Sequence, residues 1–201
     1  MWGLVQDNEI TKFINNPKSM VIGDVQYPSK IFQLWSTSEL EAIGIYEVVF
    51  NDSNKKNEKW YINTNQSFTF SDDVITASYG SATAKAHADT LWTAQDETDG
   101  KGTEGEVATR GLKYNLIQTV KAQAAGELAK TDWYITRNAE KSTAIPSAIT
   151  THRDLVRSRQ AAMETSITNA SDTPALETLY TYTTDSDGVH SRPLAEIPTL
   201  D

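Results

Sequence analysis

The chain has 201 residues, a formal net charge of −9 at pH 7, five Trp and no Cys. This length fits one ordinary domain or two small ones. The absence of cysteine excludes disulfide scaffolds, thiolate zinc sites and cysteine nucleophiles. Because the negative charge repels phosphate groups and anionic lipids, we expect neither a nucleic-acid partner nor a membrane-surface role.

The chain also lacks the patterns of membrane insertion and secretion. No window contains the 18 or more apolar residues that a membrane-spanning helix needs. The first residues carry neither the basic region nor the apolar region of a secretion signal. We therefore expect a soluble protein that no signal peptide exports.

The first eighty residues predict short antiparallel strands. Residues 3–6 and 9–14 flank Asp7-Asn8, a pair that tolerates the positive φ of a tight hairpin turn. A second hairpin is expected at residues 20–27, where Gly23-Asp24 supplies the turn. Two hairpins therefore open the chain.

One short helix interrupts these strands. Ser36 and Glu39 have the spacing of a capping box, and Gly44 is suited to end the helix. Further strands are expected at residues 45–50, 59–63, 67–70 and 74–79. Residues 1–80 are thus predicted to form a small antiparallel β meander with one short helix.

The composition then changes to Ala, Thr, Asp, Glu and Gly over residues 81–111, which we interpret as a polar linker. Gly100, Gly102 and Gly105 have the spacing of a dinucleotide-binding loop. They follow no apolar strand, however, and their neighbours are acidic. Residues 99–105 are therefore expected to be the least structured part of the linker.

Residues 112–183 predict a helical hairpin module. Apolar residues recur at spacings of three and four over a helix of about residues 109–129. A second helix is expected at residues 147–169. Its inner stripe consists of Ile149, Val156, Met163 and Ile167. The predicted fold class is α+β, with strands in the N-terminal half and the helical hairpin in the C-terminal half.

The end of the chain predicts a short third helix and a tail. Thr173 is suited to cap this helix and Pro174 to begin it. The tail covers residues 184–201. Within it, residues 185–188 resemble part of a calcium loop, but no Glu stands at the twelfth position, which favours a plain turn.

No arrangement of residues indicates catalysis. His87, His152 and His190 lie in separate segments, without the spacing of a helical metal pair. No serine stands in a G-x-S-x-G elbow. We expect no catalytic residue, no metal and no cofactor, so the function should be non-enzymatic binding.

The second long helix carries an arginine where apolar residues are expected. Helical geometry places Arg153 on the same face as the apolar stripe. One interpretation is an internal bridge to Asp132, Glu127 or Glu140, and the other is a bridge to a partner's carboxylate. In the first case we expect Asp132 to meet Arg153 while Trp133 fills the space between the two long helices.

Two stretches in the C-terminal half resemble a known module. Gly126-Glu-Leu-Ala-Lys-Thr-Asp-Trp133 precedes Ile145-Pro146, and His152-Arg-Asp-Leu-Val-Arg157 follows. This resembles the C-terminal module of phage tail assembly chaperones, with its patterns L-x-x-T/S-D-W and Y-R-x-x-L-R. The chain departs from the pattern at His152, where that family usually has Tyr, and its helix continues to about Asn169. The N-terminal half looks like small tail-region proteins of marine phages.

The resemblance implies a role in phage tail or tail-fibre assembly, exerted by binding in the host cytoplasm. The expected partners are phage tail or tail-fibre proteins, with homo-oligomerisation left open. Trp133, His152, Arg153 and Arg157 are the candidate partner-binding residues. Two alternatives remain, a permanent structural component of the virion tail and a glycan-binding module that uses the aromatic residues of the β half.

Overall fold

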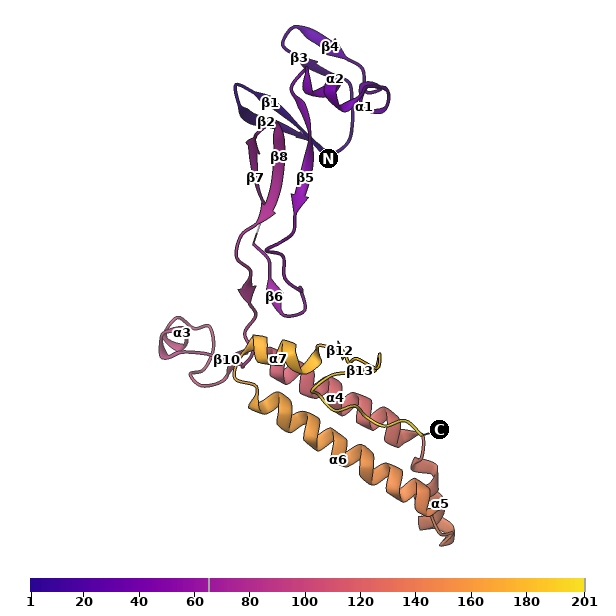
Figure 1. The fold of residues 1–201 in the computed structure, drawn as a ribbon. Coiled ribbons are helices and arrows are strands. Elements are labelled where there is room, and N and C mark those ends of the chain that lie inside the picture. Colours follow the sequence, from indigo (N-terminus) through magenta and orange to yellow (C-terminus); the bar gives the residue numbers. More distant parts are fainter. Residues whose placement is uncertain (65, 201) are drawn as a thin grey trace. The chain divides into compact units, whose positions relative to one another are not determined.

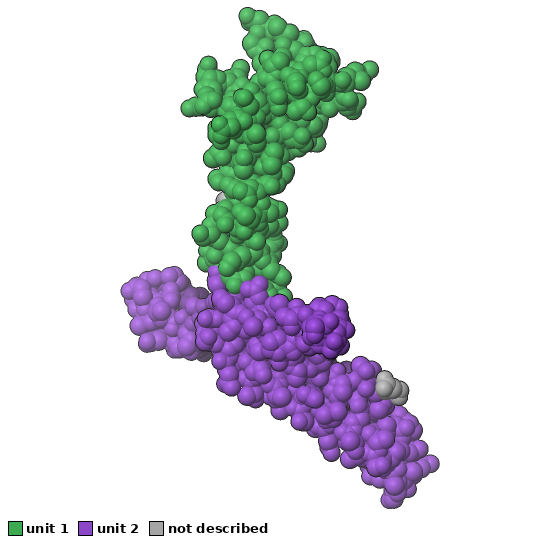
Figure 2. All heavy atoms as spheres, in the orientation of Figure 1, with its two compact units in different colours: residues 1–83 green, residues 84–201 purple. Residues whose placement is uncertain are grey.

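The computed structural model describes residues 1–64 and 66–200 and has an α+β fold (Figure 1). Strands dominate its N-terminal part and helices its C-terminal part, as the sequence predicts. The chain divides into two compact units, residues 1–83 and residues 84–201 (Figure 2). Within the described residues, no helix combines the length and the apolar character needed to cross a bilayer.

The first unit is built on a five-stranded sheet with the strand order β2-β1-β5-β8-β7. The strands are β1 (Trp2–Gln6), β2 (Glu9–Ile14), β5 (Ile45–Asn51), β7 (Gln66–Ser71) and β8 (Val74–Tyr79). Three neighbouring pairs, β1–β2, β1–β5 and β7–β8, are antiparallel as predicted, but β5 and β8 run parallel, with Val48 opposite Ile75. The sheet is therefore not a simple meander. The chain returns past β6 (Tyr61–Ile62) before β7, so that β8 enters the sheet in the same direction as β5.

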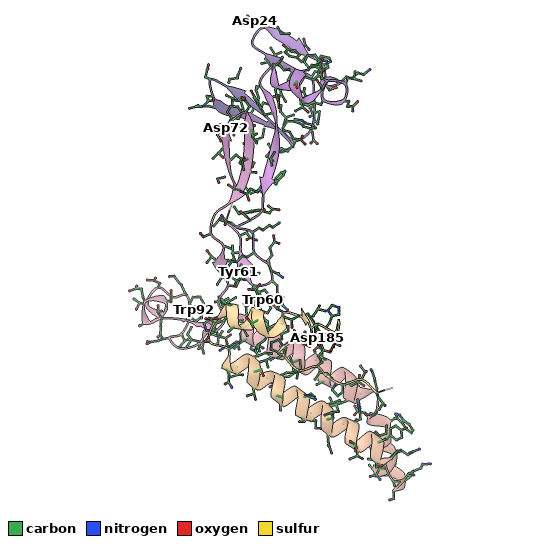
Figure 3. All side chains as sticks on the ribbon, in the orientation of Figure 1. Asp24, Trp60, Tyr61, Asp72, Trp92 and Asp185 are labelled. Carbon is green, nitrogen blue, oxygen red and sulfur yellow. The ribbon has the colours of Figure 1, made fainter. Side chains whose placement is uncertain are left out.

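Tight turns join the antiparallel pairs. Asp7 and Asn8 have φ of 53° and 63°, and Asp72 and Asp73 have φ of 50° and 58°. Asp and Asn tolerate this left-handed region better than other side chains. β3 (Met20–Ile22) and β4 (Val25–Tyr27) form the second predicted hairpin. Figure 3 labels Asp24 and Asp72 at two of these turns.

Apolar residues pack on both faces of this sheet. Leu4 and Ile45 pack with Ile31 of α1 (Ile31–Leu34) and Leu40 of α2 (Thr37–Glu41). The other cluster contains Val5, Val48, Ile75 and Ala77. The predicted capping box is present, since the Ser36 N–H donates to Glu39 Oε2 at 2.8 Å and the Glu39 N–H donates to Ser36 Oγ at 3.4 Å. α1 was not predicted, because a helix of one turn has no periodicity to detect.

The segment expected to be a linker is ordered from residue 84 onward. It contains β10 (Thr90–Leu91), α3 (Ala94–Thr98) and β11 (Val107–Thr109), and β10 pairs with β11. β9 (Thr83–Ala84) precedes them and pairs with β6. The segment interpreted as a polar linker, residues 81–111, thus contains several short regular elements, and from residue 84 it belongs to the second compact unit.

Side-chain interactions stabilise this segment around α3, although its composition is typical of a linker. Thr93 and Asp96 form a capping box at α3, and Lys101 Nζ lies 3.0 Å from both Asp96 and Asp99. Hydrogen bonds from Thr93, followed by that from Lys101, lower the pKa of Asp96 to about 2. A Cβ on Gly102 would lie 2.3 Å from Trp92 Nε1, so the missing side chain lets the indole lie against the backbone. One of the glycines in the stretch expected to be least structured, Gly102, is therefore packed against the Trp92 indole.

The second unit is dominated by two antiparallel helices, α4 (Leu112–Ala129) and α6 (Ser147–Asn169) (Figure 1). Glu127 contacts His152 at one end of the pair, and Lys113 Nζ donates to the Thr168 carbonyl at the other. Ile149, Val156, Met163 and Ile167 are buried, so the predicted stripe is confirmed. Between the helices the chain forms α5 (Asp132–Lys141), which the sequence analysis did not predict.

The C-terminal part adds α7 (Thr173–Tyr180), β12 (Thr183–Thr184) and β13 (His190–Ser191). Asp172, and not Thr173, caps α7, because the Asp172 carboxylate accepts from the Ala175 N–H at 2.8 Å. Thr173 is buried and donates to the Lys85 carbonyl at 2.6 Å instead. The predicted turn is present, and the Gly188 N–H donates to the Asp185 carbonyl at 3.1 Å.

Candidate protein-binding surface

Arg153 holds the corner between α4 and α5. The side chain is only 8% exposed, and Nη1 lies 2.8 Å from the Leu128 carbonyl, 2.7 Å from Thr131 Oγ1 and 2.9 Å from Asp132 Oδ1. All three acceptors lie around Nη1, so its two N–H groups are shared among them. The internal bridge to Asp132 is thus the interpretation that the structure supports, and the partner's carboxylate is not needed.

The neighbouring His152 is also turned inward. His152 Nε2 lies 3.2 Å from Glu127 Oε1, and both side chains are buried. Glu127 also accepts from Lys130 Nζ at 2.5 Å and from the Leu200 N–H at 2.9 Å. The bond from Lys130, followed by that from Leu200, lowers the pKa of Glu127 from its usual 4.5. His152 and Arg153 are therefore both buried and bonded to groups of their own unit, so little of either side chain is accessible to a partner.

Trp133 does not lie between the long helices. Its side chain is 51% exposed, and none of the residues of α5 is buried. The expectation of a buried indole is wrong because Asp132 begins a new helix, which carries Trp133 away from the seam. Smaller side chains, including Val120, Ala124 and Val156, already fill that seam.

Trp133 instead belongs to an exposed aromatic platform, which we define as Trp133, Tyr134 and Arg137. The two rings have centroids 3.7 Å apart and an interplanar angle of 32°. The Arg137 guanidinium lies 4.8 Å from the Trp133 centroid and 5.3 Å from that of Tyr134. Trp, Tyr and Arg are the residues most enriched at the centres of protein interfaces. Tyr134 and Arg137 were not predicted from the sequence. The pattern that could have indicated them is that Tyr134 and Trp133 precede Arg137 by three and four residues, which places all three on one side of a helix.

Arg157 lies apart from this platform. Its side chain is about half exposed on α6, and Nη1 lies 3.2 Å from Asp154 one turn away. It lines an open cleft of about 620 Å³ along α6, together with Gln160, Glu164 and Thr168. Of the four predicted contact residues, two reach solvent, Trp133 on α5 and Arg157 on α6.

The remaining histidines serve local structure. His190 Nδ1 lies 2.9 Å from Thr184 Oγ1 in the β12–β13 hairpin. The His87 carbonyl accepts from the Lys113 N–H at the start of α4, at 3.0 Å. In the described part of the chain, no three metal-ligating side chains come together.

No known protein guides the interpretation of these surfaces. Neither a protein-family model, nor a curated protein, nor a solved structure matches this chain. The function is therefore inferred from the aromatic platform, its support by Arg153, and the sequence resemblance.

Glu127 gives the site a pH dependence that can be measured. Its folded-state pKa is lowered, so its contribution to stability is complete above its usual pKa of 4.5 and is lost as the pH falls through the lowered value. We expect Glu127→Gln to lower the melting temperature at pH 7, where the carboxylate binds Lys130 and the Leu200 N–H. The difference between the two proteins should shrink steadily below pH 4.5. A difference that is constant from pH 7 to pH 3 contradicts this role.

Proposed function

We propose that the chain is a non-enzymatic accessory protein of a bacteriophage tail or tail fibre. It acts by binding another tail protein during assembly in the host cytoplasm. The resemblance of residues 126–157 to tail assembly chaperones supports the phage assignment. The observation that carries the binding role is the aromatic platform, in which the exposed Trp133 ring lies against the half-buried Tyr134 ring and the Arg137 guanidinium lies over both.

The platform is built for contact with another protein. Stacking and the guanidinium restrict the two rings before binding, so little side-chain entropy remains to be lost. The apolar ring faces gain when a partner covers them. Arg153 and Asp132 fix the first residue of α5, and so the direction in which the rings are presented.

A capture experiment tests this role. The full chain is used as bait in phage-infected cells, and captured proteins are identified by mass spectrometry. A tail or fibre protein is expected, and Trp133→Ala should weaken its binding on the order of 30-fold, as removal of an interface Trp typically does. Tyr114→Ala is the matched control, because Tyr114 carries a similar arginine contact, with Arg110 at 4.2 Å, elsewhere on the same unit.

The result contradicts the proposal if both variants capture the tail protein equally well, or if no tail or fibre protein is captured. Melting temperatures of both variants must stay near that of the parent, since each ring is substantially exposed.

A permanent place in the virion is the second candidate. The observation that favours it is the length of α6, which runs as far as Asn169, beyond the stretch that resembles the chaperone module. Purified particles distinguish the two roles. A stoichiometric amount of the chain in the particle indicates a structural component, and absence from the particle indicates an assembly factor.

A further inference from the structure

The last residues of the chain lie along the two long helices as a separate segment, residues 192–200, which we call the C-terminal strap. Leu194 is 1% exposed, and its N–H donates to the Leu179 carbonyl at 3.0 Å. At the other end, the Leu200 N–H donates to Glu127 Oε1 at 2.9 Å. Figure 1 shows this yellow segment running along α4 toward the corner where α5 begins.

The strap engages the helices in the manner of a bound peptide. It contains neither helix nor strand, and Pro193 and Pro198 limit its backbone. Leu194, Ile197 and Leu200 are spaced by three, which is the repeat of a polyproline II segment. Burial decreases along this row, from the buried Leu194 through the half-buried Ile197 to Leu200, which is 38% exposed.

The strap does not fill the groove in which it lies. On the α6 side it leaves an open cleft of about 460 Å³, lined by Leu155 and Arg159. On the α4 side it leaves one of about 520 Å³, lined by Gln123 and Lys130. Leu155 is 43% exposed at the first cleft, so apolar surface remains there for a larger ligand.

Arg159 is a recognition group that the strap does not use. Five of the six arginines have a carboxylate or an aromatic ring as a partner, whereas Arg159 has none among the described residues. The acid of the strap, Glu196, is engaged elsewhere. It accepts from the Tyr182 hydroxyl and lies 3.4 Å from Arg192 Nε. A guanidinium that lines a cleft without a carboxylate partner favours a ligand that brings a carboxylate to it.

We propose that the groove between α4 and α6 is a peptide-binding site which the C-terminal strap occupies in cis, and that its partner is an extended protein segment with apolar side chains three residues apart and a carboxylate that reaches Arg159. This site is distinct from the aromatic platform. The strap is displaceable because few contacts hold it, namely the buried Leu194, the main-chain hydrogen bonds of Leu194 and Leu200, and the contacts of Arg192 and Glu196 with Tyr180 and Tyr182. Its covalent tether gives it a high effective concentration, so a competing segment must bind more tightly than the strap, and the added contact with Arg159 contributes to that difference.

The test converts the strap into a separable ligand. A protease site is inserted after Gly188, in the exposed turn between β12 and β13 near Asp185 (Figure 3), where a new side chain meets no atom within 4 Å. The full chain is folded and then cut. The freed strap should remain bound and exchange with a labelled synthetic peptide of residues 189–200. Leu194→Asp in the peptide should weaken its binding by at least tenfold, because it places a charge in a buried apolar position.

A second peptide tests whether a carboxylate on the ligand binds Arg159. Ala195 lines the same cleft as Arg159, so Ala195→Glu in the peptide should tighten its binding about threefold, the range of an exposed ion pair. The gain should vanish on a cut chain that carries Arg159→Ala. The peptide site is overturned if the freed strap does not exchange with the labelled peptide. It is also overturned if the second unit loses its helical circular dichroism signal when the strap dissociates. The assigned partner is overturned if the Ala195→Glu peptide still binds more tightly than the parent peptide to a cut chain that carries Arg159→Ala. It is also overturned if the Ala195→Glu peptide binds the cut chain no more tightly than the parent peptide does.

Discussion

Arg153→Ala is expected to lower the free energy of unfolding of the helical unit by about 3 kcal/mol. The substitution removes the donor shared by the Leu128 carbonyl, Thr131 Oγ1 and Asp132 Oδ1. Thr131 is 1% exposed, so water cannot replace the lost donor without a local opening. The bridge to Asp132 contributes little by itself, because the Asp132 side chain is 60% exposed and solvent screens the pair. Urea unfolding followed by far-ultraviolet circular dichroism measures the change.

Two comparisons isolate this effect. Arg157→Ala removes an exposed arginine from the same helix and should change stability by no more than about 0.5 kcal/mol. Asp132→Ala should cost less than about 1 kcal/mol, and the double variant with Arg153→Ala should show weak coupling. If Arg153→Ala unfolds at the same urea concentration as Arg157→Ala, the corner does not depend on the buried guanidinium.

Ile75→Ala is expected to destabilise the first unit by about 2–5 kcal/mol. Ile75 is fully buried at the centre of the sheet and packs with Val5, Val48 and Ala77. Removing three carbons leaves a cavity that a β-sheet cannot close without shifting strands. Unfolding followed by tryptophan fluorescence and circular dichroism should show the loss. Val49→Ala is the control, because that side chain is 53% exposed on the neighbouring β5 and should change stability little.

Gly3 provides a sharper test of the same packing. A Cβ on Gly3 would lie 2.4 Å from Ile75 Cδ1, so Gly3→Ala should cost about 1–3 kcal/mol through overpacking. Ile75→Val removes the clashing atom. Gly3→Ala combined with Ile75→Val should therefore be more stable than the sum of the two single changes predicts. Strict additivity contradicts the contact.

Substitutions of the buried corner residues and of the aromatic platform should have different effects on stability and on binding. His152 and Arg153 are buried and stabilise the corner, whereas Trp133 is 51% exposed and Tyr134 and Arg137 beside it are half-buried. Variants of the first group should lose stability and with it binding. Variants of the aromatic platform should lose binding and keep stability. This difference distinguishes a contact residue from a residue that positions it.

Local features of this protein were determined by the sequence itself. The turns at Asp7-Asn8, the capping box of Ser36 and Glu39, and the apolar stripe of α6 were all predicted and are present. Each depends on residues no more than a few positions apart, or on a repeat along one helix. The chemistry of the side chains therefore sets them without knowledge of the rest of the chain.

The tertiary structure decided the features that depend on distant residues. The parallel pairing of β5 with β8 depends on the path of the intervening chain. The order of residues 84–111 depends on contacts across that segment, such as Arg110 with Asp89 and the Trp92 indole with the backbone of Gly102. Trp133 was expected in the core because it is a large apolar residue located between the two long helices in the sequence. It is exposed because α5 begins one residue earlier and smaller side chains close the seam. The strap was predicted as a tail because three apolar residues among prolines have no periodicity of helix or strand. Only in the folded unit does the strap lie beside α6 and α4, where Leu194 becomes buried and Ile197 half-buried.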